Sequence, residues 1–270
     1  MDVLSLPFIQ HAIVAGFLAA IACGMIGSLV VVNRAVFLAG GIAHAAYGGV
    51  GLAFFLSLPA LPCIIGFSLF MALIMASLTA ERRQRMDTFI GVLWAVGMAI
   101  GIILIDLSPG YNVDLMSFLF GSILTVPGSD IKIMALVDFV TVFLVCAFYK
   151  EFLAMSYDVE FARVRGVPVR LLHFLFLALV ALAVVMTIRV VGLILVMALF
   201  TMAPYLTERF SRSLATMMAG ACLANMFFVF TGLWLSYRYN LTSGATIILV
   251  AAVFFLVFVF GEKFFSANRK

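Results

Sequence analysis

The chain carries very little charge: only 10% of its 270 residues are Asp, Glu, Lys or Arg, whereas soluble domains carry roughly 25%. So few charges cannot cover the surface of a soluble globular domain, and that class is excluded. A transmembrane β-barrel is also disfavoured, because its strands alternate apolar and polar residues and this sequence has long uninterrupted apolar runs instead.

Cysteine and enzyme motifs are also scarce. The four cysteines all lie in apolar runs and form no CxxC pair, which favours packing over disulfides or a thiolate metal site; they are Cys23, Cys63, Cys146 and Cys222. The sequence contains no HExxH and no GxxxxGK[ST] phosphate loop. We therefore predict that the chain is not an enzyme and hydrolyses no ATP itself. The first residues lack the basic n-region of a cleavable signal peptide, so we expect the first apolar segment to be retained.

Apolar residues make up 66% of the chain, with a mean hydropathy of +1.27. They gather in runs of about the 20 residues that a transmembrane helix needs. Nine segments are predicted: 9–32, 36–57, 61–80, 88–107, 131–149, 171–190, 191–206, 213–236 and 244–261. The seventh is short and directly follows the sixth, so a re-entrant or half-spanning helix there would leave eight spans. We predict an all-α, polytopic transmembrane bundle of eight or nine spans, as one domain over residues 1–270.

The basic residues indicate how the bundle is oriented. If the nine segments alternate, thirteen of the sixteen lysines and arginines fall on one side. Lys and Arg mark the cytoplasmic loops of membrane proteins, which predicts an outer N-terminus and a cytoplasmic C-terminus. The net charge of +4 is explained by these loops, and we expect a lipid bilayer and no nucleic acid as the partner. A short segment at Leu115–Val126, between the fourth and fifth spans, is predicted to be re-entrant or interfacial.

The longest inner loop, about residues 150–170, mixes charged and apolar residues. Asp158 to Arg165 can form two helical turns with acids first and bases last, which suits the helix dipole. Gly166 is placed to end this helix, and Pro168 follows it. The loop is either a docking surface for a cytoplasmic partner or a solvated connector.

The most distinctive segment is residues 40–51, which contains a histidine and five glycines within an apolar run. On a helix, Gly41, His44, Gly48 and Gly51 follow a 3-4-3 spacing and share one face. A neutral imidazole is a common metal ligand and is costly to leave in lipid. His44 is therefore either a transient metal ligand lining a transport pathway or a residue that hydrogen-bonds a neighbouring helix on a packing face.

Two further polar residues lie deep in apolar segments. Asp138 is a second, weaker candidate metal ligand, because an intramembrane carboxylate is a functional-site hypothesis by default. An interhelical hydrogen bond is its alternative role. Asn225 is expected to form such a bond between helices.

Several motifs together resemble one family. The cytoplasmic pattern Asp158-x-Glu160-x-Ala162-x-x-x-Gly166 is similar to the loop of ABC importer permeases of the zinc/manganese/iron-chelate type. Three further stretches resemble the same family, in the right order. They are Val31–Arg34 followed by Gly41–Ala45, Val191–Leu199 with Pro204, and Ser236–Tyr237 with Gly244.

The resemblance implies a function and its partners. The chain would be a multi-pass permease subunit of the cytoplasmic (inner) membrane that imports a divalent zinc, manganese or iron ion and holds no permanent cofactor. It would act as a homodimer with a separate cytoplasmic ATPase subunit and an extracytoplasmic solute-binding protein. Asp158, Glu160, Ala162 and Gly166 would belong to the helix that couples to the ATPase.

The resemblance also implies that the glycine-rich segment lies near the transport pathway. Tyr47 and four glycines would pack helices together there; the glycines are Gly40, Gly41, Gly48 and Gly51. The chain departs from the family at two places. Many members carry an Asp four residues before the histidine, where this chain has Gly40. Many also have Asp-x-Pro-x-Gly near the last helix, where this chain has Asn240–Gly244. What would complete a site around His44 therefore stays open, with backbone carbonyls, water, Tyr47 or a distant carboxylate as candidates.

Three alternatives remain at this point. A secondary transporter would commonly show inverted repeats and several charges at mid-membrane, and we find no clear repeat. A permease of the same kind could carry a metal chelate or another small solute. A non-transporting membrane component is the third alternative.

Overall fold

The structure is a computed structural model that describes residues 7–80, 86–108, 121, 123–193 and 196–267. Every regular element in these ranges is a helix. In chain order they are α1 (Pro7–Val32), α2 (Val36–Ala45), α3 (Tyr47–Phe55), α4 (Ala60–Thr79), α5 (Met86–Asp106), the 3₁₀ helix η3 (Ile123–Thr125), α7 (Gly128–Ala147), α8 (Tyr149–Tyr157), α9 (Val159–Val164), α10 (Val169–Val191), α11 (Val196–Glu208), α12 (Leu214–Tyr239) and α13 (Ser243–Ala267).

The predicted all-α, polytopic bundle is confirmed. Seven spans in the described residues are long and apolar enough to cross a membrane, one of them formed by α2 and α3 together. The count rises to eight if α7 and α8, which meet at an angle of 68°, are taken as one span. The short segment expected after the sixth span is α11, which has 13 residues. Most of the predicted segment Leu115–Val126 lies outside the described residues.

The centre of the bundle is built on α1 and α10, while α5 and α13 form its rim. Two thirds of the apolar window of α1 and of α10 are buried inside the protein, against 17% for α5 and 28% for α13. Helix α1 packs against α7, α10, α11 and α12, and α5 packs against α2, α3 and α4. The faces of α5 and α13 that the protein does not bury are apolar, so they fit a lipid environment.

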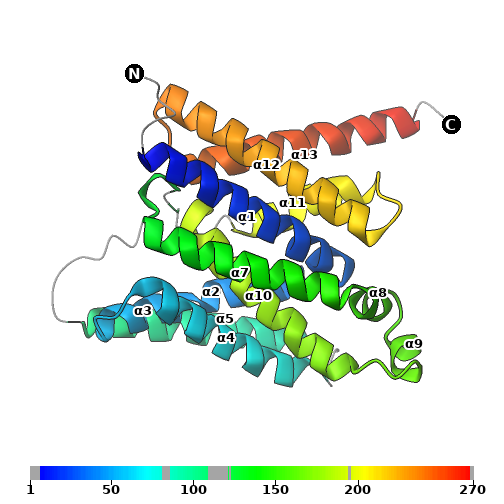
Figure 1. The fold of residues 1–270 in the computed structure, drawn as a ribbon, viewed down its shortest axis with the longest axis horizontal. Helices are drawn as coiled ribbons and strands as arrows, with labels where there is room; N and C mark the ends of the chain where they lie inside the picture. Colours follow the sequence, from blue (N-terminus) through cyan, green and yellow to red (C-terminus); the bar gives the residue numbers. More distant parts are fainter. Residues whose placement is uncertain (1–6, 81–85, 109–120, 122, 194–195, 268–270) are drawn as a thin grey trace.

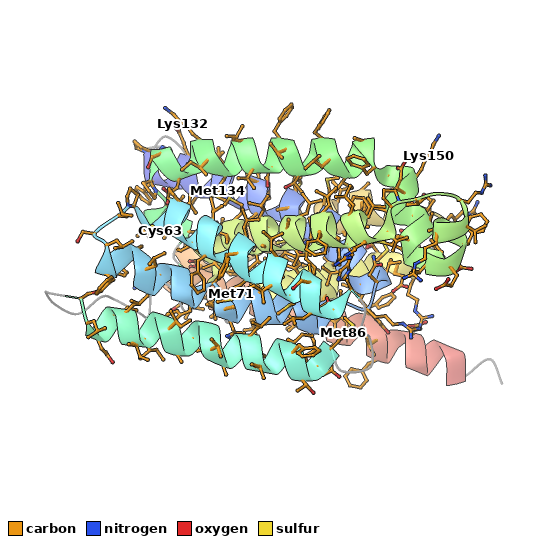
Figure 2. All side chains as sticks on the ribbon, turned by 90° about the horizontal axis from the view of Figure 1, so that it is seen from below. Cys63, Met71, Met86, Lys132, Met134 and Lys150 are labelled. Atoms are coloured by element: carbon orange, nitrogen blue, oxygen red, sulfur yellow. The ribbon has the colours of Figure 1, made fainter. Side chains whose placement is uncertain are left out.

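The long helices run side by side, and the chain ends lie at opposite ends of the bundle (Figure 1): α1 begins at one end and α13 finishes at the other. Figure 2 shows Lys150 and Met86 toward one end, and Lys132 and Cys63 toward the other. Helices α8 and α9 lie at the end where α13 finishes. This arrangement agrees with the alternation on which the predicted orientation rests.

Helices α2 and α3 form one span, as the sequence pattern predicted, because Ala46 between them keeps a right-handed helical backbone with φ −55° and ψ −21°. A break follows α10, where Gly192 adopts φ +86°, a conformation that favours glycine. Helix α11 starts after this break and is about 20 Å long at 1.5 Å per residue, which is shorter than the roughly 30 Å hydrocarbon core. Interrupted helices are typical of substrate sites in transporters.

Glycines allow α3 and α5 to approach closely. A β-carbon added at Gly51 would lie 2.7 Å from Cα of Gly101, and backbone atoms cannot move aside as a flexible side chain can. We therefore expect Gly51→Leu to separate the two helices and to lower the yield of folded protein sharply. Gly66→Leu is the matched control, because no atom lies within 4 Å of a β-carbon there. Fluorescence-detected size-exclusion chromatography after a heating series would measure both; equal thermal stability of the two variants would contradict this packing role.

Candidate metal site and ATPase-docking loop

The predicted glycine–histidine face continues from α2 into α3 and packs against α5. Gly41 lies against Ile90, and Gly48 against Phe67 and the carbonyl of Gly97. Gly51 lies against Gly101, as described above. Tyr47 is buried and also contacts Gly101. The spacing thus forms a packing face, and its small residues bring α5 close to the helix pair α2–α3.

His44 occupies the middle of this face. Its ring stacks on that of Trp94 in α5, with ring centroids 4.0 Å apart and an interplanar angle of 9°. The Trp94 indole in turn donates from Nε1 to Sδ of Met98 at 3.2 Å. His44 is half-buried, and its Nδ1 atom is buried without a hydrogen-bond partner in the described structure. The interhelical hydrogen bond that was the alternative role of His44 is therefore not formed by this atom.

Stacking leaves the imidazole able to bind a cation. The lone pair of a neutral imidazole lies in the plane of the ring, and Trp94 covers the face of the ring. A cation in the ring plane would not be blocked by the indole. Trp94 was missed from the sequence. It precedes Gly97 by three residues, and Gly97 and Gly101, four residues apart, share one face of α5; this small-residue face could have suggested α5 as the partner helix.

Gly40 lies one helical turn before His44 and faces a different neighbour. A β-carbon at Gly40 would be 3.1 Å from Sδ and 3.0 Å from Cε of Met197. Met197 is the second residue of α11 and is half-buried. A thioether therefore fills the space beside Gly40.

Asp138 lies in α7 and forms a separate polar position. Its side chain is 4% exposed, and neither carboxylate oxygen has a hydrogen-bond partner in the described residues. Thr141, one turn further along, is also buried, and its Oγ1 likewise lacks a partner. An unpaired polar group buried in an apolar region costs several kcal/mol. Asp138 does not form the interhelical hydrogen bond considered from the sequence with any described residue. The cost of burying its carboxylate therefore favours a functional role.

The structure does not bring Asp138 and His44 into one group. Helix α7 packs mainly on α1 and α10, whereas the His44 ring lies on α5. Asp138 is close enough to Cys23 of α1 and Cys222 of α12 to influence them electrostatically. Within the described residues, no three His, Cys, Asp or Glu side chains are grouped to hold a metal ion.

Two other predictions for side chains in apolar segments agree with the structure, apart from Cys146, which is exposed on α7. Asn225 donates from Nδ2 to the carbonyl of Leu199 at 3.3 Å, which links α12 to α11 as expected. The four cysteines are free, and Cys23 pairs its thiol with the hydroxyl of Thr187 at 3.1 Å. These contacts are ordinary interhelical packing.

The charged loop forms the expected short helix, α9. Asp158 is its N-cap, and its Oδ1 accepts from the amides of Glu160 and Phe161, each at 3.0 Å. Gly166 ends the helix with φ +79°. The amide of Val167 then bonds the carbonyl of Ala162 at 3.0 Å, in the manner of a glycine-terminated helix end.

The four residues of the loop motif have different structural roles. Asp158 and Gly166 shape the ends of α9, and Ala162 is fully buried beneath it. Glu160 points outward, with 78% of its side chain exposed, and pairs with Arg163 at 3.0 Å. The sequence argument missed the exposed apolar side chains beside it, Phe161 and Val164, which are 52% and 87% exposed. Exposed apolar groups on a charged helix are typical of a contact surface for another protein.

Helix α8 is tied to two long helices by side-chain hydrogen bonds. Nδ2 of Asn33, at the end of α1, donates to Oγ of Ser156 at 2.8 Å. The hydroxyl of Tyr149 accepts from the amide of Ala215, in the first turn of α12, at 3.1 Å. The loop is thus held to α1 and α12 by hydrogen bonds, in addition to its covalent connections to α7 and α10.

Long apolar helices, the short helix α11 after the break at Gly192 and polar side chains buried within the spans indicate a multi-pass membrane protein of the transporter class. A model of the ABC 3 transport family matches residues 5–262. The chain belongs to this family.

Individual relatives agree with this assignment. An uncharacterised membrane protein of Synechocystis sp. is 48% identical over 257 residues, covering 95% of this chain and 92% of that protein. The manganese transport system membrane protein MntC of Listeria monocytogenes is 31% identical over an alignment that covers 97% of this chain and 95% of MntC. The solved structure of PsaBC from Streptococcus pneumoniae in complex with Fab superposes with a TM-score of 0.84 at 30% identity, covering 94% of this chain and 91% of that chain.

These matches confirm the family resemblance predicted from the sequence motifs. They also confirm that the chain is a multi-pass permease of the cell membrane and not an enzyme.

Proposed function

We propose that this chain is the transmembrane permease subunit of an ABC importer that moves a divalent transition-metal ion into the cytoplasm. Zinc, manganese and iron are the candidate ions. The names of relatives support a metal substrate, since they include metal and manganese transport system membrane proteins. No permanently bound cofactor is needed, because the ion is cargo.

The observation that supports this proposal most directly is the unpaired, buried nitrogen of His44. An imidazole nitrogen is buried near the middle of the span Val36–Phe55 and has no hydrogen-bond partner in the described residues. Such a group is costly unless it binds something during the functional cycle. A weak, transient ligand suits a permease, because an ion that enters must also leave.

The partners follow from the same proposal. Two copies of the single domain 1–270 would form one pathway, with outer N-termini and cytoplasmic C-termini. An ATPase subunit would dock on the loop of about residues 150–170, contacting Glu160 on a helix shaped by Asp158, Ala162 and Gly166. A solute-binding protein would deliver the ion at the outer face.

The direct test is metal uptake into vesicles that contain the permease, its ATPase and its binding protein. We expect uptake of a divalent ion only when ATP is supplied to the ATPase. Uptake by the permease alone would identify a secondary transporter instead. Transport of a metal chelate with no transport of the free ions would contradict the proposed substrate.

We expect Glu160→Arg to weaken association with the ATPase without affecting the fold. The residue is exposed and pairs with Arg163 on the solvent-facing side of α9, an arrangement worth little to stability. A pull-down of the ATPase by the purified permease would measure the loss, which we expect to be at least about tenfold if the charge faces the partner.

Glu208→Arg is the matched control, because Glu208 is an exposed glutamate at the end of α11, near the same end of the bundle. Loss of binding in both variants would point to general charge rather than to docking at α9. Undiminished binding by Glu160→Arg would remove α9 as the docking element.

A further inference from the structure

We propose that Asp138 binds a proton inside the bundle, so that a neutral carboxylic acid lies between α7 and its neighbours at neutral pH. This site goes beyond the proposed function, because it involves neither the metal ion nor the ATPase. The proposal depends on the depth of the carboxyl group, on the charged residues of the helices around it, and on the hydrogen bonds that its polar neighbours already make.

The carboxyl group of Asp138 lies deep in its helix and is closed off from solvent. Asp138 is the eleventh of the twenty residues of α7, which places it about 15 Å from one end of the helix and about 14 Å from the other. The residue is 4% exposed, and both carboxylate oxygens lack a hydrogen-bond partner in the described structure. An isolated ionised carboxylate is so costly in an apolar interior that such a group takes up a proton instead.

No described helix packed on α7 offers a positive charge to Asp138. Helix α7 packs on α1, α8 and α10. On α1, His11 lies beside Gly128 at the start of α7, ten residues before Asp138. Lys132, the nearest basic residue along α7, is exposed and points away from the bundle (Figure 2). The other charged residues and histidines of α7, α8 and α10 belong to α8 and to the terminal turns of α7 and α10; they are Asp130, Lys150, Glu151, Arg170, His173 and Arg189.

Two cysteines lie near Asp138, but their thiols are engaged with other groups. Asp138 influences both Cys23 and Cys222 electrostatically. The thiol of Cys23 pairs with the hydroxyl of Thr187 at 3.1 Å. The thiol of Cys222 donates to the carbonyl of Ile21 at 3.6 Å. A thiol carries no positive charge, so neither cysteine offsets the charge of a carboxylate.

Thr141 adds a single neutral hydroxyl on the same face of α7. It lies three residues after Asp138, a spacing that makes side chains neighbours on a helix. The hydroxyls of Thr79 and Thr187 donate to the carbonyl four residues earlier, whereas that of Thr141 has no partner in the described residues. One hydroxyl is too little for the four lone-pair sites of a carboxylate, but it is enough to accept the one O–H of a carboxylic acid.

The direct test is infrared spectroscopy of the purified full-length permease in a detergent without ester groups. A protonated carboxyl has a C=O stretching band that a carboxylate lacks. The difference between the wild type and Asp138→Asn isolates the band of Asp138. At neutral pH we expect a band that shifts in D₂O and disappears only at alkaline pH.

Asp106→Asn is the matched control, because Asp106 is an exposed aspartate at the end of α5. Its difference spectrum should contain only carboxylate bands at neutral pH. If Asp138→Asn does not fold, carbon-13 labelling of the aspartate carboxyls identifies the same band in the wild type. Asp130→Asn then shows whether the other buried aspartate of α7 contributes to it.

Thermal unfolding gives a second measurement. Above about pH 4 an unfolded aspartate is ionised, so a folded state that keeps the proton binds one proton more than the unfolded state. Each further pH unit then raises the ratio of unfolded to folded protein about tenfold, until the infrared band disappears. Asp138→Asn lacks this proton. We therefore expect its advantage in unfolding temperature over the wild type to increase as the pH is raised, and Asp106→Asn to show no such trend.

Three results would overturn the proposal. The first is a difference spectrum with only carboxylate bands of Asp138 at neutral pH, since the group would then be ionised. The second is a protonated band that persists unchanged in Asp138→Asn, which would belong to another residue. The third is an advantage of Asp138→Asn that is the same at every pH. None of these measurements needs ATP or a metal ion, so they leave the proposed transport function to its own test.

Discussion

Replacing His44 with alanine is expected to abolish ATP-driven metal uptake while leaving the permease folded and assembled. The imidazole of His44 is half-buried and has an unpartnered nitrogen in a described span, and Trp94 stacks on the face of its ring. Removing groups that merely support a metal ligand costs about 10–100-fold in affinity or activity. Loss of the ligand itself should cost at least the upper limit, about a hundredfold, measured as the initial rate of uptake into vesicles.

The folding control for this variant is thermal unfolding in detergent. Alanine removes the stacking contact with Trp94, which is worth about 0.5–1.5 kcal/mol, so a small loss of stability is expected. His11→Ala is the matched histidine control, since His11 lies in the second turn of α1, far along the chain from the proposed pathway. Normal uptake by His44→Ala would show that His44 serves packing alone, and Asp138 would then be the next candidate ligand to test.

Replacing Asp138 with asparagine is expected to make the permease more resistant to heat and, at the same time, a poorer transporter. Both carboxylate oxygens are buried and unpaired in the described residues, so a neutral side chain of the same shape removes a desolvation cost. If the carboxylate serves the ion or the movement of α7, uptake should fall by about tenfold. The unfolding temperature and the uptake rate of the same preparation measure the two effects.

Asp130→Asn provides the comparison within the same helix. Asp130 lies in the first turn of α7, where a negative charge is stabilised by the helix dipole, so its neutralisation should not raise the unfolding temperature. An unfolding temperature lowered by Asp138→Asn would show that a favourable contact of the carboxylate is lost. Increased stability with unchanged uptake would leave Asp138 without a role in transport.

The helices were predictable because lipid imposes a simple requirement. Each span needs about 20 apolar residues, and the predicted segments agree with the observed helices to within a few residues at most ends. The span Val36–Phe55 was predicted as one segment, and alanine, the best helix former, keeps the backbone helical at Ala46. The break after α10 was foreseen only as a short seventh segment, which Gly192 now explains.

The candidate site was predictable only in part. His44 and Asp138 stood out because their residue types are rare in apolar spans. Trp94 did not, because its importance comes from a contact with a helix 50 residues away in the sequence. Within α9, the capping roles of Asp158 and Gly166 follow from local rules, whereas the burial of Ala162 depends on the packing of α9 against α8 and α10.

The hydrogen bonds from α8 have a mechanical consequence. Asn33 and Tyr149 link this helix to α1 and α12, the two helices that carry Cys23 and Cys222 beside Asp138. A displacement of α8 by an ångström would stretch both bonds beyond their working length, so α1 and α12 must either follow or detach. A movement of α8 would therefore be passed to α1 and α12, and so to the helices that carry the two cysteines near Asp138.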